Sequence, residues 1–388
     1  MQQPDYQGHG IFNLMASIRH AFGAGHEASP AAECALIDAS ELREVRHVML
    51  IVIDGMGVAQ LEDHCPDGAL AAARRGTLSS VFPSTTASAI TTFMSADAPL
   101  RHGLTGWHMW FRELGVVGAP LPFHVRGSRD DLGHWGIDAA SLFNTRSLFA
   151  QLHRESYIIH PANLAGSAYT RAHAGKARLK KYRNLAGMLK HLAHIAKGTR
   201  HSYSYAYWPQ LDALSHVHGA HSRECAEHLL ELDEAIADLA RKLRGTGTLL
   251  LVCADHGFVD TRPQTRILLE RHPDLARTLL LPLCGEPRTV YCYVRAGADE
   301  DFSAYIAEHL QHACEVHHSA DLLANGYLGL GQQHPEIHSR VGSHVLLMKD
   351  HYCLVDRLPG EPGPFRQVGV HGGMSEAELR VPLISFGP

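Results

Sequence analysis

HVMLIVIDGMG, residues 47–57, decides the fold, because its continuous apolar run ends abruptly in Asp-Gly. TLLLVCADHGF, residues 248–258, repeats the pattern with Asp-His-Gly at its end. A short, uninterrupted apolar run that ends in polar residues is typical of a strand buried on both faces of a parallel sheet. We therefore predict an α/β fold, a doubly wound and mostly parallel sheet flanked by helices.

An amphipathic helix leads directly into the second of these strands. RECAEHLLELDEAIADLARKLRG, residues 223–245, has one broad apolar stripe and ends at a glycine. Helix followed by strand is the order that a doubly wound sheet requires. The remaining segments define the predicted organisation: an N-terminal lead segment at 1–45 in which FNLMASIRHAF forms a short helix, a core of 46–261 and 346–388, a helical excursion at 126–200, and a small inserted α+β cap at 262–345.

Composition excludes several classes of partner. The formal net charge is −5 and there is no long Lys/Arg run, which argues against a nucleic acid polymer or an anionic membrane surface as partner. The N-terminus lacks the basic start and unbroken apolar core of a signal peptide, so we expect a cytoplasmic protein. The eight cysteines are scattered singly, which predicts buried, reduced thiols rather than disulfides or a thiolate zinc site.

Metal-ligand side chains stand at four places along the chain. Asp54 and the pair Asp255-His256 follow the two buried strands, where ligands gather in open α/β sheets. Asp212 and His216 are four residues apart, on one face of a helical turn. His371 lies in VGVHGGMS, beside glycines that give a ligand room to approach. Each alone also has an ordinary interpretation as a turn, an N-cap or a surface hydrogen bond.

Taken together, these three aspartates and three histidines suit two sites of mixed nitrogen and oxygen ligation. Two adjacent polar residues that emerge from a buried strand, as Asp255 and His256 do, are costly unless something pairs with them. A divalent metal is the simplest partner. The mixture of imidazole and carboxylate favours zinc, and it leaves manganese and iron open.

VFPSTTASA, residues 81–89, places three hydroxyls in a row ahead of a small-residue helical run. Ser84, Thr85 and Thr86 are all good helix N-caps, and without a metal nearby the cap is the simpler interpretation. A hydroxyl next to a divalent cation is different, because the cation makes the alkoxide accessible at neutral pH. The first turn of the helix would also present free N–H groups to a phosphoryl oxygen.

The chain resembles the type I phosphodiesterase/nucleotide pyrophosphatase family of the alkaline phosphatase superfamily. Five motifs carry the resemblance in the family's order: IVIDGMG (51–57), FPSTTASAITT with LRHGLTG (82–92, 100–106), the Tyr207–Gly219 segment, ADHGF (254–258) and GVHGG (369–373). Singly these motifs are weak, but five in register are specific, and they span nearly all of the chain from residue 47 onward.

The resemblance implies an alkaline phosphatase-like core with two metal sites. Asp212, His216 and His371 would hold one zinc ion, and the other would be held by Asp54, Asp255, His256 and the Thr86 hydroxyl. Thr86 would be the nucleophile of a two-metal phosphodiesterase or nucleotide pyrophosphatase that acts through a phospho-threonine intermediate on a small phosphorylated substrate such as a nucleotide.

One departure from the family leaves the substrate open. Diester-cleaving relatives carry an asparagine three residues after the nucleophile, where this chain has Ala89, so a donor to a phosphoryl oxygen is missing or comes from Ser88, Thr85 or the Ala87 N–H. A phosphomonoesterase or phosphonate hydrolase with the same site is therefore an alternative, as is a catalytically silent protein that binds metal or nucleotide. Nearby aromatic residues, Trp107 among them, fit base stacking or ordinary packing.

Overall fold

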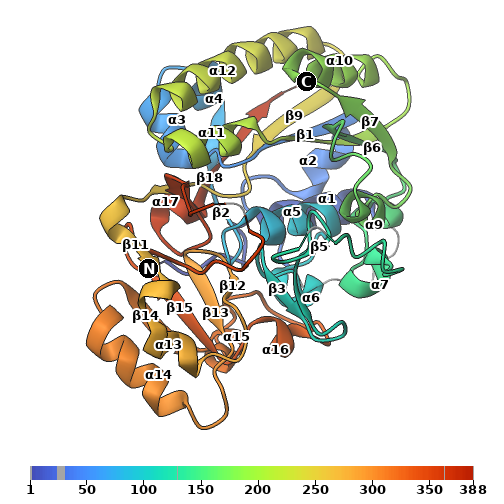
Figure 1. Cartoon of the computed structure of the whole chain (residues 1–388). Helices are drawn as coiled ribbons and strands as arrows, with labels where there is room; N and C mark the ends of the chain where they lie inside the picture. Colours follow the sequence, from blue (N-terminus) through green and yellow to red (C-terminus); the bar gives the residue numbers. More distant parts are fainter. Residues whose placement is uncertain (1, 24–30, 129, 362, 388) are drawn as a thin grey trace.

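A seven-stranded sheet forms the centre of the larger part of the molecule (Figure 1). The computed structural model describes residues 2–23, 31–128, 130–361 and 363–387. The strand order is β2-β18-β9-β1-β8-β6-β7, with the bounds β1 (His47–Ile53), β2 (Arg74–Ser79), β6 (Glu155–Pro161), β7 (Arg178–Tyr182), β8 (Ser202–Trp208), β9 (Thr248–Cys253) and β18 (Arg380–Phe386). Only β18 is antiparallel to its neighbours. The predicted mostly parallel α/β sheet is confirmed.

Helices cover both faces of this sheet (Figure 1). One face carries α3 (Val58–His64), α4 (Ala69–Ala72), α10 (Leu185–Ile195), α11 (Gln210–His218) and α12 (Arg223–Leu243), and the other carries α1 (Ile11–Phe22), α2 (Ala39–Glu44), α5 (Thr86–Ser95), α6 (Pro99–His102) and α8 (Leu148–Gln151). α12 begins at an N-cap, Ser222, and buries the predicted apolar stripe. The predicted N-terminal helix is α1, which packs on α2 and α5 in the main core.

The prediction of a helical excursion at 126–200 is wrong where the chain forms β6 and β7, which lie at one edge of the main sheet. β7 contains the basic residues Arg178, Lys180 and Lys181, in a segment that we predicted to be helical. α10 starts only at Leu185. The physical reason is the position of β7: charged side chains on an outermost strand hinder pairing with other chains, so a basic sequence is compatible with this edge.

The cap is a second, antiparallel sheet of four strands (lower left in Figure 1). It contains β12 (Cys284–Gly285), β13 (Thr289–Cys292), β14 (Cys314–His318) and β15 (His344–Met348), with α13 (Pro273–Thr278), α14 (Asp299–Tyr305), α15 (Ser319–Ala324) and α16 (Ile337–Arg340) around it. The predicted return to the core at residue 346 is wrong, because β15 pairs with β13 and β14. An apolar run such as HVLLM identifies a buried strand but not the sheet to which it belongs.

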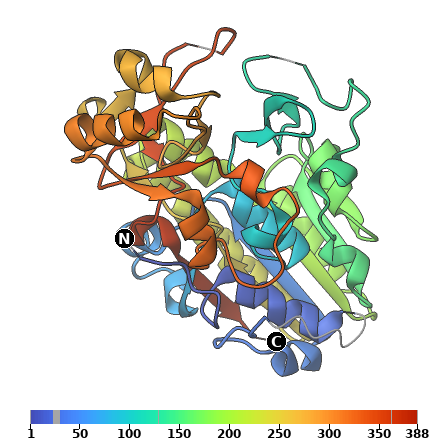
Figure 2. The ribbon, with the colours of Figure 1, turned by 90° about the horizontal axis from the view of Figure 1, so that it is seen from below.

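The cap is joined to the core at several places. β16 (Cys353–Val355) pairs with β11 (Arg266–Leu268) within the cap, whose buried cluster includes Ile267 and Leu354. A small sheet contains β3 (Met109–Phe111), β4 (Val116–Ala119) and β5 (His124–Val125), and its strand β3 contacts β12 of the cap. Figure 2 shows these segments from below, with the cap in orange and the β3–β5 segment in teal. The two parts also share a cluster of buried side chains that includes Phe82 and Tyr291.

The cysteines and the apolar helices can be compared across the described residues. All eight cysteines are buried and free, as predicted. Among the described residues, no helix combines the length and the apolar character needed to cross a membrane.

Candidate active site

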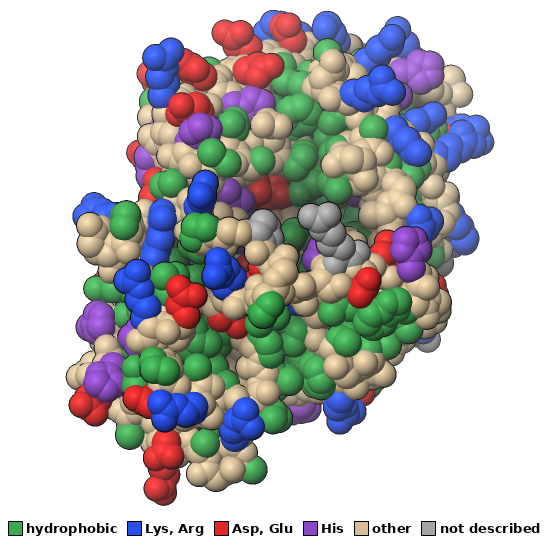
Figure 3. Space-filling view, in the orientation of Figure 1, with side chains coloured by type: hydrophobic (Ala, Val, Ile, Leu, Met, Phe, Trp, Pro, Cys, Tyr) green, Lys and Arg blue, Asp and Glu red, His purple; other side chains and the backbone are tan. Residues whose placement is uncertain are grey.

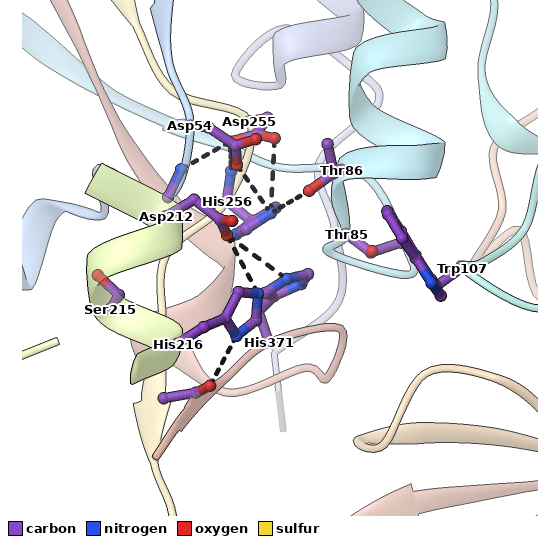
Figure 4. Close-up of polar contacts among 12 residues, drawn as sticks. Asp54, Thr85, Thr86, Trp107, Asp212, Ser215, His216, Asp255, His256 and His371 are labelled. Atoms are coloured by element: carbon purple, nitrogen blue, oxygen red, sulfur yellow. Dashed lines mark hydrogen bonds and ion pairs between the residues drawn. The ribbon is translucent and has the colours of Figure 1, made fainter. Parts of the chain in front are cut away.

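Three aspartates meet at the carboxyl ends of the central strands (Figure 4). Asp54 directly follows β1, Asp255 lies two residues beyond β9, and Asp212 is in the first turn of α11, just after β8. The strands are in register at this edge, since Ile53 pairs with Trp208 and Val52 with Cys253. The topology alone therefore brings together side chains that lie up to 201 positions apart in the sequence.

Two glycines after β1 make this convergence possible. Gly55 has φ +77°, and a Cβ atom there would lie 2.4 Å from the ring of Phe258. Gly57 passes so close to Gly257 that an added Cβ would lie 2.8 Å from the Gly257 Cα. The Asp-Gly pattern at the ends of both strands is thus a requirement of close backbone packing behind the aspartates.

Asp54, Asp255 and His256 form the first group of possible ligands. The His256 Nε2 atom lies 3.4 Å from Asp54 Oδ1 and 3.5 Å from Asp255 Oδ2. Its Nδ1 atom is 3.2 Å from the Gly257 carbonyl, which only accepts, so Nδ1 is the donor in this contact and Nε2 faces the carboxylates. One oxygen of each aspartate, Asp54 Oδ1 and Asp255 Oδ2, is buried and has no hydrogen-bond partner among the described residues.

Asp212, His216 and His371 form the second group. Asp212 Oδ1 is buried and unpaired, 3.4 Å from His216 Nε2 and 3.8 Å from His371 Nε2. The Nδ1 atom of His216 donates to the Gly369 carbonyl at 2.8 Å, which turns its Nε2 toward Asp212. The rings of His371 and His256 are stacked with their centroids 3.7 Å apart, so the two groups are in direct contact.

Two sets of three ligand atoms are close enough to share an ion. They are Asp54/Asp255/His256 and Asp212/His256/His371, each with all its ligand atoms within 4.8 Å of one another. The first is the group that the resemblance implies. The second contains His256 where the resemblance implies His216, because His256 lies between the two clusters.

None of the three hydroxyls at 84–86 caps the following helix. Thr85 is the N-cap residue of α5, but α5 has no side-chain cap hydrogen bond. Ser84 donates to the Gly373 carbonyl at 2.7 Å and Thr85 donates to Glu286 Oε1 at 2.6 Å. Thr86 Oγ1 instead lies 3.1 Å from His256 Nε2. The capping interpretation therefore fails, and Thr86 faces the ligand groups (Figure 4).

Burial and like charges dominate the electrostatics of the site. Burial, with Asp255 and Asp212 nearby, holds the pKa of Asp54 well above its usual range, and burial also raises the pKa of Asp212. Burial and the neighbouring His256 and His216 hold the pKa of His371 well below its usual range. In the absence of a cation, these groups favour their neutral forms.

Two residues at the site were missed by the sequence analysis. The Tyr207 hydroxyl donates to Asp54 Oδ2. Its place in the Tyr207–Gly219 motif was a usable signal, but the sequence analysis considered only base stacking or packing for such aromatic residues. Glu286 comes from the cap and accepts hydrogen bonds beside Thr86. No local pattern in the sequence marks Glu286, because it lies in an inserted segment.

A cavity of about 840 Å³ lies between the core and the cap and contains the site at one end. Thr86, Asp212, His216 and His371 line that end, and Trp107 and Glu286 line its cap side. Figure 3 shows the surface hollowed at this level, with acidic and histidine side chains visible in the hollow. Of the aromatic residues near the site, Trp107 lines the cavity with its side chain 42% exposed, whereas Phe111 and Tyr205 are fully buried in the core.

Comparisons with known proteins show the family and the fold of the chain. Residues 48–373 match the model of the family described as type I phosphodiesterase / nucleotide pyrophosphatase. Among solved structures, murine ectonucleotide pyrophosphatase / phosphodiesterase 5 is similar, with a TM-score of 0.66, 15% identity and 88% of each chain covered. An inactive variant of the same murine protein in complex with AMP has a TM-score of 0.65 and 15% identity, with 88% of each chain covered.

A phosphonoacetate hydrolase has a similar fold. The enzyme from Sinorhizobium meliloti 1021 in complex with phosphonoacetate gives a TM-score of 0.61 at 14% identity, with 89% of this chain and 91% of that chain covered. At such low identity these structures show a shared fold. No curated protein matches the chain in a search by sequence.

Proposed function

Because the chain belongs to the type I phosphodiesterase / nucleotide pyrophosphatase family, and so is a hydrolase of phosphoester bonds, we propose that it cleaves phosphodiester or phosphoanhydride bonds with Thr86 as nucleophile. The observation that carries this proposal is the position of the Thr86 hydroxyl, 3.1 Å from His256 Nε2 at the junction of the two ligand groups. Two divalent cations, zinc in the first instance, would complete the site, with manganese or iron as substitutes.

The donor set fits divalent cations. Three carboxylate oxygens, from Asp54, Asp212 and Asp255, are buried without hydrogen-bond partners and lie within 4 Å of a histidine Nε2 atom. Unpaired buried charges are costly, and a cation is the partner that would satisfy all three. Asp54, Asp255, His256 and Thr86 would hold one ion, and Asp212, His216 and His371 the other. Such ions would lower the pKa of the threonine hydroxyl and neutralise charge on the phosphoryl and leaving oxygens.

The position of Thr86 at the start of α5 fixes the direction of its hydroxyl. As the first helical residue, it points its Oγ1 away from the helix and toward His256. Attack forms a bond from Oγ1 to phosphorus and breaks the bond to the leaving group on the opposite side. The product of this step is a phospho-threonine, which water then hydrolyses to regenerate the hydroxyl.

Backbone N–H groups at the start of α5 are the simplest replacement for the family's asparagine as donors to a phosphoryl oxygen. Two side chains that could replace the asparagine already donate elsewhere. The Ser88 hydroxyl donates to the Leu104 carbonyl at 3.0 Å, and the Thr85 hydroxyl donates to Glu286. The first N–H groups of a helix have no partner within it, and in α5 Ala89 is the residue whose N–H bonds back to the Thr85 carbonyl. The N–H groups of Thr86 and Ala87 precede it and can stabilise a phosphoryl oxygen.

A second enzymatic candidate, a phosphonate hydrolase or phosphomonoesterase, keeps the same site. Ala89 and the shared fold with phosphonoacetate hydrolase favour it. The charge of the cavity argues against a carboxylated phosphonate. The described lining residues include no lysine, and of their two arginines Arg126 is bound by Asp356 and Glu361 at 2.5 and 2.9 Å and Arg357 is exposed. A protein that only binds metal or nucleotide would need no positioned nucleophile.

A substrate comparison tests the proposal. Metal-stripped protein, reloaded with zinc or with manganese, would be assayed on bis(4-nitrophenyl) phosphate, on 4-nitrophenyl phosphate and on phosphonoacetate. We expect the diester to be cleaved fastest and the reaction to vanish in Thr86→Ala, which should retain its bound metal. Cleavage of the monoester or the phosphonate alone would transfer the proposal to the second candidate, and no turnover of any of them would leave only the binding role.

A further inference from the structure

Glu286 brings a carboxyl group from the cap to the side of the nucleophile. It lies in the turn between β12 and β13, is 7% exposed and lines the same cavity as Thr86. Its Oε1 atom accepts from the Thr85 hydroxyl at 2.6 Å and from the backbone N–H of Trp107 at 2.7 Å. Gly372, with φ +107°, packs on the side chain so closely that an added Cβ would lie 2.6 Å from the Glu286 Cβ. The carboxyl group is thus held in one place.

The second oxygen of Glu286 is unused. Oε2 has no hydrogen-bond partner among the described residues, and unlike the unpaired oxygens of the three aspartates it is not sealed from solvent. No cation neutralises it either: Arg126 is already bound by Asp356 and Glu361, and Arg357 is exposed. Burial accordingly raises the pKa of Glu286 to about 7.

A purely structural role does not require this carboxylate. The neutral amide oxygen of a glutamine would accept the same two hydrogen bonds, and it would avoid burying a charge. An acceptor that is fixed in place, unpaired and open to the substrate cavity is suited to a hydrogen-bond donor on the substrate. Its position beside Thr85 indicates which part of the substrate it meets, because in an in-line reaction the leaving group lies opposite the attacking oxygen.

We propose that Glu286 is a specificity residue, whose free Oε2 recognises a hydroxyl or ammonium group on the substituent that stays on phosphorus during the first step. This inference rests on the proposed phosphodiesterase activity and narrows its substrates to diesters with a hydrogen-bond donor on that substituent. A carboxylate on that substituent of the substrate would be repelled by the Glu286 carboxylate.

Four chromogenic diesters test the proposal. Each is a 4-nitrophenyl phosphate ester of a small alcohol, so that the leaving group is constant: ethyl without a donor, 2-hydroxyethyl, 2-aminoethyl as the ammonium, and carboxymethyl. The zinc-loaded wild-type protein would be assayed above the pKa of Glu286, so that the carboxyl group is charged. We expect kcat/KM to be about tenfold or more higher for at least one donor ester than for the ethyl ester, the size of effect expected for a hydrogen bond to a charged group. The hydroxyl and ammonium arms identify which donor is preferred.

Glu286→Gln is the informative variant, because its amide keeps an acceptor for Thr85 and Trp107 and presents an NH₂ group to the cavity. We expect it to lose the preference for donor esters and to improve on the carboxymethyl ester relative to the ethyl ester. Glu234→Gln, on the exposed face of α12, makes the same chemical change away from the site and should leave all ratios unchanged.

The outcomes separate this inference from the function on which it rests. If the wild-type protein cleaves all four diesters at similar kcat/KM, or if Glu286→Gln slows all of them by one factor, the role of Glu286 in specificity is overturned while the phosphodiesterase stands. If the wild-type protein cleaves none of them, both fail. If Glu286→Gln does not fold, the ratios of kcat/KM among the four diesters for the wild-type protein decide whether donor esters are preferred.

Discussion

The Thr86 hydroxyl oxygen lies 3.1 Å from Nε2 of His256, although 170 positions separate the two residues in the chain. Thr86 starts α5, and His256 follows the central strand β9. A helix start with free N–H groups and a strand end with buried carboxylates are thus brought face to face. Under the proposed function, this relationship would combine a nucleophile, its activating groups and donors for phosphoryl oxygen in one place.

Removal of metal should change both activity and stability. Three buried carboxylate oxygens without partners lie at the site, and a ligand that binds only the folded state stabilises it. We expect chelation to abolish turnover, and addition of zinc at about 100 times its Kd to raise the free energy of unfolding by about 2.7 kcal/mol. Thermal melts with and without zinc, together with elemental analysis, measure this.

Asp255→Asn provides the control for metal binding. It removes a charge from one ligand group and should reduce the bound metal and the thermal shift together. Equal metal content and equal stabilisation in the variant and the wild type would contradict the assignment of Asp255 as a ligand.

The hydroxyl of Tyr207 should tune metal affinity through Asp54. It donates to Asp54 Oδ2. Loss of a hydrogen bond that orients a metal ligand lowers metal affinity or activity by roughly 10–100-fold. We expect such a loss in Tyr207→Phe, measured by competition with a chromogenic chelator. Tyr205→Phe is a matched control on the same strand, since the Tyr205 hydroxyl is buried without a partner, and it should leave affinity unchanged. Equal effects of the two variants would contradict the role of Tyr207.

Glu286 should make stability depend on pH. Burial, in opposition to hydrogen bonds from Thr85 and Trp107, raises its pKa from 4.5 to about 7. Between these values the folded protein holds a proton that the unfolded chain releases, so the free energy of unfolding falls as pH rises through this window. The full effect of one such group is about 3 kcal/mol.

Glu286→Gln should remove this dependence. Relative to the wild type, the variant should gain stability as pH rises from 5 to 8, measured by urea denaturation of both proteins at each pH under the same metal conditions. The surface variant Glu234→Gln should show no such gain. A constant difference between Glu286→Gln and the wild type across the range would refute the raised pKa.

The ion pair of Arg288 and Glu378 should hold the cap to the core. Both side chains are buried, two nitrogens of Arg288 meet the carboxylate at 2.9 and 3.0 Å, and Glu378 also accepts from the Gly373 N–H near His371. Arg288→Ala leaves a buried charge unpaired, so we expect a loss of about 3–5 kcal/mol in unfolding free energy.

The double variant Arg288→Met/Glu378→Met separates pairing from packing. It removes both charges at similar volume and should recover much of the lost stability in urea denaturation. If the double variant is as unstable as Arg288→Ala, the loss is not due to an unpaired charge.

Much of the site was predictable because its residues stand at strand ends. Asp54 and Asp255 follow long apolar runs, and parallel strands bring their carboxyl ends to one edge of the sheet. The basic segment that became β7 was mispredicted, because position at a sheet edge is a tertiary property that charge pattern does not reveal. Glu286 was missed for the same reason: only the folding of the cap over the core brings it to Thr85. The sharing of His256 between two groups depends on side-chain distances that no sequence pattern contains.

The most direct test of the central claim is to trap the covalent intermediate. Zinc-loaded protein would be quenched in acid within milliseconds of mixing with a 4-nitrophenyl phosphodiester, and its peptides would be analysed by mass spectrometry. The account predicts a phosphoryl ester on Thr86, absent from Thr86→Ala, which should be inactive. Undiminished turnover in Thr86→Ala, with no adduct on the wild-type peptide, would contradict it.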